Sequence, residues 1–78
     1  MTHRPELLDI VELVDATHAP GRRPGEQGTV VECLPRGWFI VEFDQTEDDD
    51  LALHDLPAAA LRVVWRNATR APVAKFSA

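Results

Sequence analysis

The sequence predicts a small all-β domain, and three observations support this fold class. Two apolar, β-branched runs, Thr29–Leu34 and Trp38–Phe43, alternate around Glu32 and Glu42 with the period of two that marks a half-buried strand. A three-residue Pro-Arg-Gly turn joins them, and its glycine suits a hairpin with a bulge. A chain of 78 residues has room for one domain with one modest core. We therefore expect a small five-stranded antiparallel barrel built around this hairpin.

The elements before the hairpin follow from residue type and spacing. Residues 1–6 form a lead-in, and the apolar residues of 7–14 fit either a helix or a strand. Their β-branched content and the absence of a nearby helix C-cap favour a strand over Ile10–Val14. Residues 15–24 contain two prolines and predict a loop that carries the only paired arginines. Residues 25–28 begin and end with glycine, which allows a tight corner before the next strand.

The elements after the hairpin are shorter. The charged residues 44–50 connect to a short strand over Leu51–His54, and residues 56–60 predict one turn of 3₁₀ helix. Leu61–Trp65 then forms the fifth strand of the barrel. The expected division of the chain is a lead-in at 1–6, an SH3-like β-barrel at 7–65 and a loosely held C-terminal tail at 66–78.

Alternation assigns the apolar residues to two faces if the acidic residues point outward. The predicted inward set is Val11, Leu13, Val31, Cys33, Phe39, Val41, Phe43, Leu51, Leu53, Leu56, Leu61 and Val63. The predicted outward set is Ile10, Val14, Val30, Leu34, Trp38, Ile40, Val64 and Trp65. Three explanations of the outward set stay open: a binding face, a C-terminal tail that folds back with Val73 and Phe76, or bent strands that bury both faces.

Composition excludes several classes of protein. The net charge of −5 and the pI near 4.9 argue against a partner made of phosphates. No apolar run approaches the roughly 20 residues that span a bilayer, and the N-terminus is not a secretory signal. The single cysteine, Cys33, makes no internal disulfide and fits a reducing cytoplasm, where we expect it as a buried core thiol.

The sequence shows no apparatus for catalysis or for metal binding. The acidic run 47–50 fails the EF-hand spacing, since Asp49 stands where that loop needs glycine and Asp55 where it needs glutamate. His3, His18 and His54 have no partner ligand at zinc-site spacing. No nucleophile elbow and no phosphate-binding loop is present. We expect no cofactor, no metal and no small-molecule ligand.

Several short motifs occur in an order that resembles a known family. They read LLDIVEL at 7–13, GEQGTVVE at 25–32, FIVEF at 39–43 and LPAAALRVV at 56–64. This pattern resembles a family of short bacterial proteins of unknown function with an SH3-like barrel. The resemblance spans about residues 7–64 and implies that fold, but it implies no activity because the fold hosts many functions.

Two better-known groups share parts of the pattern. KOW-type modules of ribosomal and transcription proteins have a similar G-x-x-G-x-V turn, found here at Gly25–Val30, but Glu26 and Gln27 replace their basic residues. The barrel of the nitrile hydratase β subunit is similar in its G-x-x-G-T-V-V turn, V-x-F strand and leucine-rich turn. That likeness implies a possible accessory subunit that supplies no metal ligands.

These observations predict a non-catalytic interaction or accessory module that binds another protein or a second copy of itself. Trp38 is the expected anchor, because aromatic residues contribute much of the energy of an interface. The candidate protein-binding residues are Trp38, Ile40, Val30, Leu34, Asp48 and Asp49. The alternative is a KOW-like nucleic-acid or ribosome-associated module that uses Arg22, Arg23 and Arg36 with Arg62. A third hypothesis is a subunit of an enzyme whose active site lies mainly on a partner chain.

Overall fold

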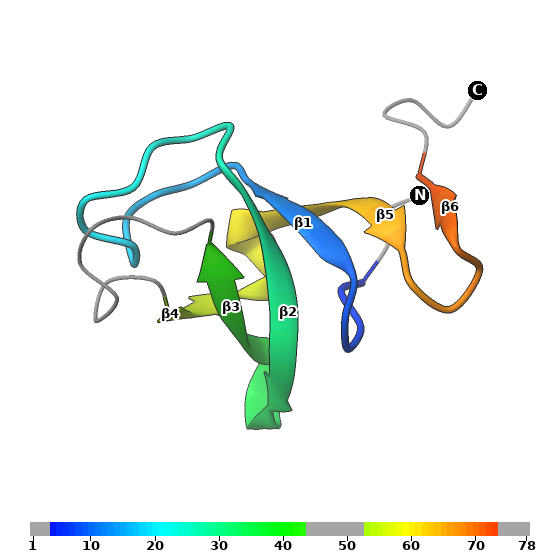
Figure 1. The fold of residues 1–78 in the computed structure, drawn as a ribbon. Helices are drawn as coiled ribbons and strands as arrows, with labels where there is room; N and C mark the ends of the chain where they lie inside the picture. The colour runs from blue at the N-terminus through cyan, green and yellow to red at the C-terminus, as the bar shows by residue number, and fades with distance from the viewer. Residues whose placement is uncertain (1–3, 44–52, 74–78) are drawn as a thin grey trace.

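The protein is built from antiparallel strands. The computed structural model describes residues 4–43 and 53–73, and these residues contain six strands, two 3₁₀ turns and no α-helix (Figure 1). The strands are β1 (Ile10–Leu13), β2 (Gln27–Leu34), β3 (Trp38–Phe43), β4 (Leu53–Pro57), β5 (Leu61–Arg66) and β6 (Ala71–Pro72). The 3₁₀ turns are η1 (Pro35–Gly37) and η3 (Ala58–Ala60). The predicted all-β class is confirmed.

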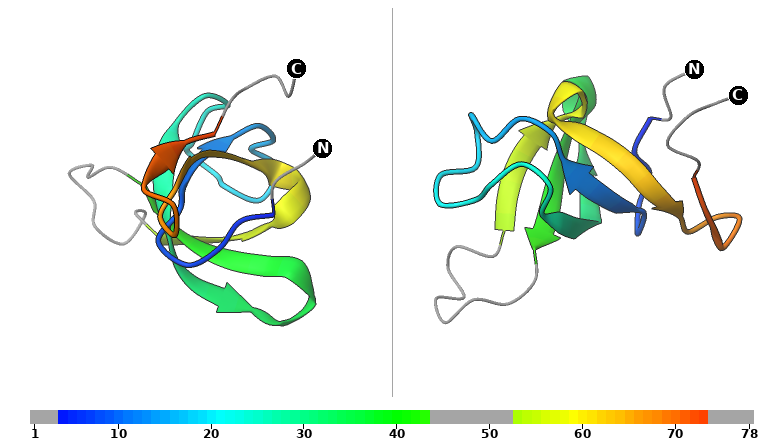
Figure 2. Two further views of the ribbon diagram at one scale, coloured as in Figure 1. Left: turned by 90° about the vertical axis from the view of Figure 1, so that its right-hand side faces the viewer. Right: turned by 90° about the horizontal axis from the view of Figure 1, so that it is seen from above.

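All six strands belong to one sheet, in the order β4-β3-β2-β1-β5-β6. The sheet is strongly curved and wraps around the core (Figure 2). Within the described residues β4 and β6 are edge strands, and no pairing joins them. The prediction of a closed five-stranded barrel is therefore not confirmed, because the sheet has a sixth strand and stays open.

Most of the predicted elements are present. The strand over 10–14, the hairpin of β2 and β3, the 3₁₀ turn before the last predicted strand and the strand from Leu61 are confirmed. β4 extends three residues beyond the predicted end at His54, and the first two residues of the predicted strand, Leu51 and Ala52, lie outside the described residues. Residues 71–72, expected in a loose tail, form β6 and pair with Trp65 and Arg66 of β5.

The core lies on the concave side of the sheet. Val11 and Leu13 of β1 face Phe39, Val41 and Phe43 of β3 in a single buried cluster. The remaining members come from the other strands and from the long loop: Ala19, Val30, Leu56, Leu61 and Val63. Val73 packs against this cluster, and its N–H donates to the Val64 carbonyl at 2.9 Å. The chain after β5 therefore returns to cover part of the core.

A β-bulge in β2 overturns part of the predicted core. The register between β2 and β3 shifts between Val30 and Glu32, so Val31 has no partner of its own in β3. Val30 is fully buried and pairs with Val41, whereas Val31 is 38% exposed. Strict alternation predicts the opposite, with Val31 buried and Val30 exposed. The extra residue changes the side to which each one points.

Two other predicted core residues are exposed for different reasons. Cys33 pairs with the buried Phe39 but is exposed, because β1 pairs with β2 only over Gln27–Thr29 and leaves Cys33 with a neighbouring strand on one side. Leu53 is 53% exposed because it pairs with the outward-facing Glu42. The third, Leu51, lies outside the described residues.

Candidate functional site

A row of apolar side chains lies on the convex side of β2, β3 and β4. Residues that are paired across antiparallel strands point to the same side of a sheet. Leu34 pairs with Trp38, and Trp38 pairs with Pro57, so these three side chains form one apolar row across the three strands. All three are partly buried. The row lies at the end of the hairpin, next to η1.

A second row, next to the first, is flanked by carboxylates. Ile40 lies two residues from Trp38 on the same side of β3, with Glu32 on one neighbouring strand and Asp55 on the other. Glu42 follows two residues further along β3. These three carboxylates are exposed, and among the described residues none forms a hydrogen bond or an ion pair. We call the apolar row, Ile40 and these carboxylates the outer sheet face.

The long loop between β1 and β2 reaches Trp38. The rings of His18 and Trp38 meet edge to face, with centroids 5.3 Å apart. The Asp15 carboxylate accepts hydrogen bonds from the hydroxyl (2.6 Å) and the N–H (3.0 Å) of Thr17, which close the turn before His18. These two hydrogen bonds hold the pKa of Asp15 below its usual range. His18 is therefore presented to Trp38 by a structured turn.

Arg22 anchors the other end of the same loop. Its side chain is only 5% exposed, with the guanidinium carbon 5.0 Å from the centre of the Phe43 ring and Nη1 3.1 Å from Oε1 of Glu26. Glu26 also accepts a hydrogen bond from the N–H of Arg23 at 2.6 Å. The Arg23 N–H, and after it Arg22, lower the pKa of Glu26. With the fully buried Ala19, these contacts fix the loop along β3.

Two arginines lie at the hairpin end of the outer sheet face. Arg36 has a left-handed backbone with φ of 66°, which is uncommon for a residue other than glycine. Nη2 of Arg4 lies 3.4 Å from the place that a Cβ on Gly37 would occupy. Arg66 Nη2 donates to the Arg4 carbonyl at 3.0 Å and so fixes the backbone from which that side chain extends. The end of the hairpin is therefore basic.

The structure brings some of the predicted site residues together and separates others. Trp38, Ile40 and Leu34 share the outer sheet face, but Val30 is a core residue and cannot belong to it. Asp48 and Asp49 lie outside the described residues. Pro57, Glu32 and Asp55 belong to the face and His18 contacts it, although the sequence pattern predicted no binding role for any of them. Their positions depend on register and loop packing, and neither is visible in the sequence.

The arginines of the nucleic-acid alternative do not share one surface. The Arg22 guanidinium lies over the Phe43 ring and pairs with Glu26. Arg62 donates a hydrogen bond from Nε to Glu12 Oε1 at 3.0 Å. Arg36 lies at the opposite end of β3 from Phe43, and six residues of strand span about 17 Å. Within the described residues, Arg22, Arg36 and Arg62 therefore do not form one continuous basic surface.

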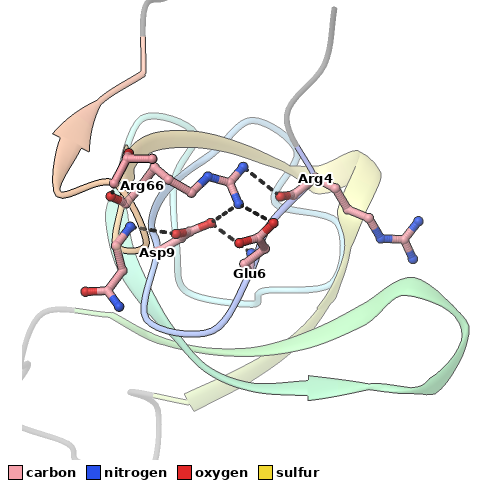
Figure 3. A network of polar contacts seen from close by, with 6 residues as sticks. Arg4, Glu6, Asp9 and Arg66 are labelled. Atoms are coloured by element: carbon pink, nitrogen blue, oxygen red, sulfur yellow. Dashed lines mark hydrogen bonds and ion pairs between the residues drawn. The ribbon is translucent and has the colours of Figure 1, made fainter.

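The most buried charge in the described residues is Asp9, which belongs to a network at the start of β1 (Figure 3). Its Oδ1 accepts the N–H of Asn67 at 2.9 Å, and its Oδ2 accepts the N–H of Glu6 at 2.8 Å. Nη1 of Arg66 lies 3.0 Å from Asp9 Oδ2 and 2.9 Å from Glu6 Oε2. Both are close ion pairs without the alignment of a hydrogen bond. The network joins the N-terminal segment to the turn between β5 and β6.

This network is structural. Both oxygens of Asp9 already accept from backbone N–H groups, and the nearby cation neutralises its charge. Asp9 is fully buried and both of its oxygens are engaged, so it is not presented to a substrate or a metal from outside. The sequence analysis missed it, although an aspartate inside an otherwise apolar run is a signal that a buried partner must exist.

Two kinds of feature are absent from the part of the chain that the structure describes, a cluster of metal ligands and a helix able to cross a membrane. No group of three or more histidine, cysteine or acidic side chains is arranged there to hold a metal ion. No helix of those residues has the length and hydropathy that a bilayer crossing requires.

The family of the chain is shown by its sequence. Residues 7–63 match the family model described as a domain of unknown function (DUF4926), and the protein belongs to that family. No curated protein and no solved structure gives a significant match to the chain.

Proposed function

We propose that this member of the family is a non-catalytic module that binds another protein through the outer sheet face. The observation that carries the proposal is the apolar row of Leu34, Trp38 and Pro57 on an open part of the sheet. A small domain that places three apolar side chains side by side on its convex surface leaves them available to a partner. Trp38 at the centre of the row is the expected anchor.

The proposal includes the fold as an open variant of an SH3-like barrel. The order of a long loop, a tight hairpin, a short strand, a 3₁₀ turn and a last strand supports this description. Such a scaffold hosts many activities, so the function is argued from the outer sheet face and not from the fold.

The edges of the sheet support binding through the face and not by strand addition. Edge strand β4 carries the charged Asp55 and ends at Pro57, and edge strand β6 consists of Ala71 and Pro72. Short strands, charges and prolines at an edge discourage pairing with a further strand. A partner that cannot add a strand must contact side chains instead.

Binding to a purified partner tests this function. The full chain, with an affinity tag, is used to isolate host proteins, and each candidate is then produced and titrated by calorimetry. We expect Trp38→Ala to weaken binding by at least about tenfold, as is typical of an interface anchor. Trp65→Ala removes the same kind of side chain from β5 and should change the affinity less than about twofold. Circular dichroism of both variants establishes that they fold.

Two results would overturn the proposal. One is a partner whose affinity is the same for Trp38→Ala and for the unmodified chain. The other is that no candidate reproduces binding with purified components. An accessory subunit of an enzyme is one form of this function, and it predicts that the purified partner is that enzyme.

A further inference from the structure

We infer that the segment bound by the outer sheet face is cationic, with lysine or arginine side chains on both sides of an apolar residue. This inference rests on the proposed function and names the chemistry of the partner. It follows from the position of Glu32, Glu42 and Asp55 around Ile40. The apolar residue would contact Trp38 and Ile40, and the cations would reach the carboxylates.

The spacing of the carboxylates fits such a segment. Neighbouring strands lie about 4.8 Å apart, so Glu32 and Asp55 flank Ile40 at that spacing on either side. Glu42 lies two residues from Ile40, about 7 Å along β3. Lysine and arginine have stems long enough to lie on apolar surface while the charged group reaches a carboxylate. One apolar contact between two ionic contacts is therefore sterically possible.

The like charges on this face are not compensated by any residue that the structure describes. Glu32, Glu42 and Asp55 are exposed and have no ionic partner among the described residues. In contrast, three other carboxylates of the same chain, Glu12, Glu26 and Asp9, are each paired with an arginine. Mutual repulsion on one surface lowers stability slightly, and a cationic partner would remove it.

The basic hairpin end gives the bound segment a direction. Arg36 and Arg4 lie beyond the apolar row, on the side away from Ile40 and Glu42. A segment with positive charges is repelled there and attracted toward Glu42 and Asp55. The cationic residues of the partner should therefore lie toward the Glu42 end of β3.

The same charges argue against two other occupants. A second copy that bound through the same face would place the two sets of carboxylates against each other, because such an interface is self-complementary. A nucleic acid would place phosphates against them. The outer sheet face therefore favours a protein segment of opposite charge.

Selection from a random peptide library tests the inference. Twelve-residue peptides displayed on phage are selected on the immobilised full chain at about 0.1 M salt, and recovered peptides are titrated by fluorescence anisotropy. We expect peptides with lysine or arginine on both sides of an apolar residue. The double variant Glu32→Gln with Asp55→Asn should bind about threefold to tenfold more weakly. The control, Glu6→Gln with Glu12→Gln, removes the same charge away from the outer sheet face and should bind normally.

The possible results are distinguishable. Peptides that need Trp38 but show no enrichment in basic residues would overturn the inference and leave the proposed function standing. An equal loss of binding in both double variants would show attraction by net charge alone, which also overturns it. Recovered peptides that bind Trp38→Ala normally, or a library that yields no binder, would overturn both. So would tighter binding of a uridine oligonucleotide than of any peptide, or dimerisation that the Glu32 and Asp55 replacements strengthen.

Discussion

Gly28 of β2 packs tightly against β3. A Cβ at this position would stand 2.8 Å from the carbonyl oxygen of Glu42 and 2.8 Å from Cγ1 of Val41. The valine side chain could turn away, but the carbonyl belongs to the hydrogen-bonded strand and cannot move without its neighbours. Close approach of the backbone, and not a special φ angle, therefore requires glycine here.

Replacement of Gly28 by alanine should destabilise the protein by about 1–3 kcal/mol, the usual cost of inserting a methyl group into a packed site. Urea denaturation measures the change in the free energy of unfolding. A loss below about 0.5 kcal/mol would show that β2 and β3 separate easily at this point.

Arg36 shows the opposite case, in which a side chain occupies a conformation that suits glycine. Its φ of 66° lies in the left-handed region, which costs an L-residue roughly 1–2 kcal/mol. Arg36→Gly removes that strain, although glycine loses more backbone entropy on folding. We expect the free energy of unfolding of Arg36→Gly to equal that of the unmodified chain or to exceed it by up to about 1 kcal/mol. Arg36→Val should be less stable than both, since a β-branched residue tolerates this region worst. Any other order in thermal denaturation contradicts the assignment.

At the scale of the element, the long loop between β1 and β2 is a folded unit. Its turn at Asp15 and Thr17, the buried Ala19 and the Arg22–Phe43 contact hold its two ends. The prolines and glycines of this stretch correctly predict a loop, but they contain no information about where the loop packs. Its contact with Trp38 makes it part of the outer sheet face.

The contacts of Glu26 with Arg22 and Arg23, which hold this loop, should weaken in acid. The pKa of Glu26 is lower in the folded protein than in the unfolded chain, where it is near 4.3. Its ionised form therefore adds stability above about pH 4.3, and this stability is lost as the pH falls through the folded-state pKa. Glu26→Gln should be less stable than the unmodified chain at pH 6–7, and the difference should shrink below pH 4. A difference that stays constant from pH 7 to pH 3 in urea denaturation would contradict this.

At the scale of the whole molecule, the Asp9 network joins the two ends of the described chain. Residues 4–9 lie beside the turn between β5 and β6 (Figures 2 and 3). Because β1 has only four residues and β6 only two, these polar contacts add to the few backbone pairs that hold this edge of the sheet. They also fix the backbone of Arg4, from which its side chain extends to the hairpin end.

Asp9→Ala should be strongly destabilising, by about 3–5 kcal/mol, because it removes the buried carboxylate beside Arg66 and leaves the N–H groups of Glu6 and Asn67 without their acceptor. Asp9→Leu combined with Arg66→Met removes both charges and should lose less than Asp9→Ala alone. Chemical denaturation of the single and double variants measures the coupling between the two residues. If the stability losses of the two single variants sum to the loss of the double variant, Asp9 and Arg66 do not act as a pair.

The sequence by itself determined the all-β class and the order along the chain of β1 to β5, because a period of two around Glu32 and Glu42 leaves a buried side for Phe39, Val41 and Phe43. It also determined that Trp38 and Ile40 share one side of β3. Their role in binding stays a prediction.

Only the tertiary structure decided the rest. The bulge at Val31 has no chemical signature, so alternation alone exchanges the faces of Val30 and Val31. The pairing of Asp9 with Arg66 joins residues far apart in the chain, and the neighbours of Ile40 depend on the register of two other strands. Local pattern determines which way a side chain points along a regular strand. Strand register and contacts between distant parts of the chain determine which residues that side chain packs against.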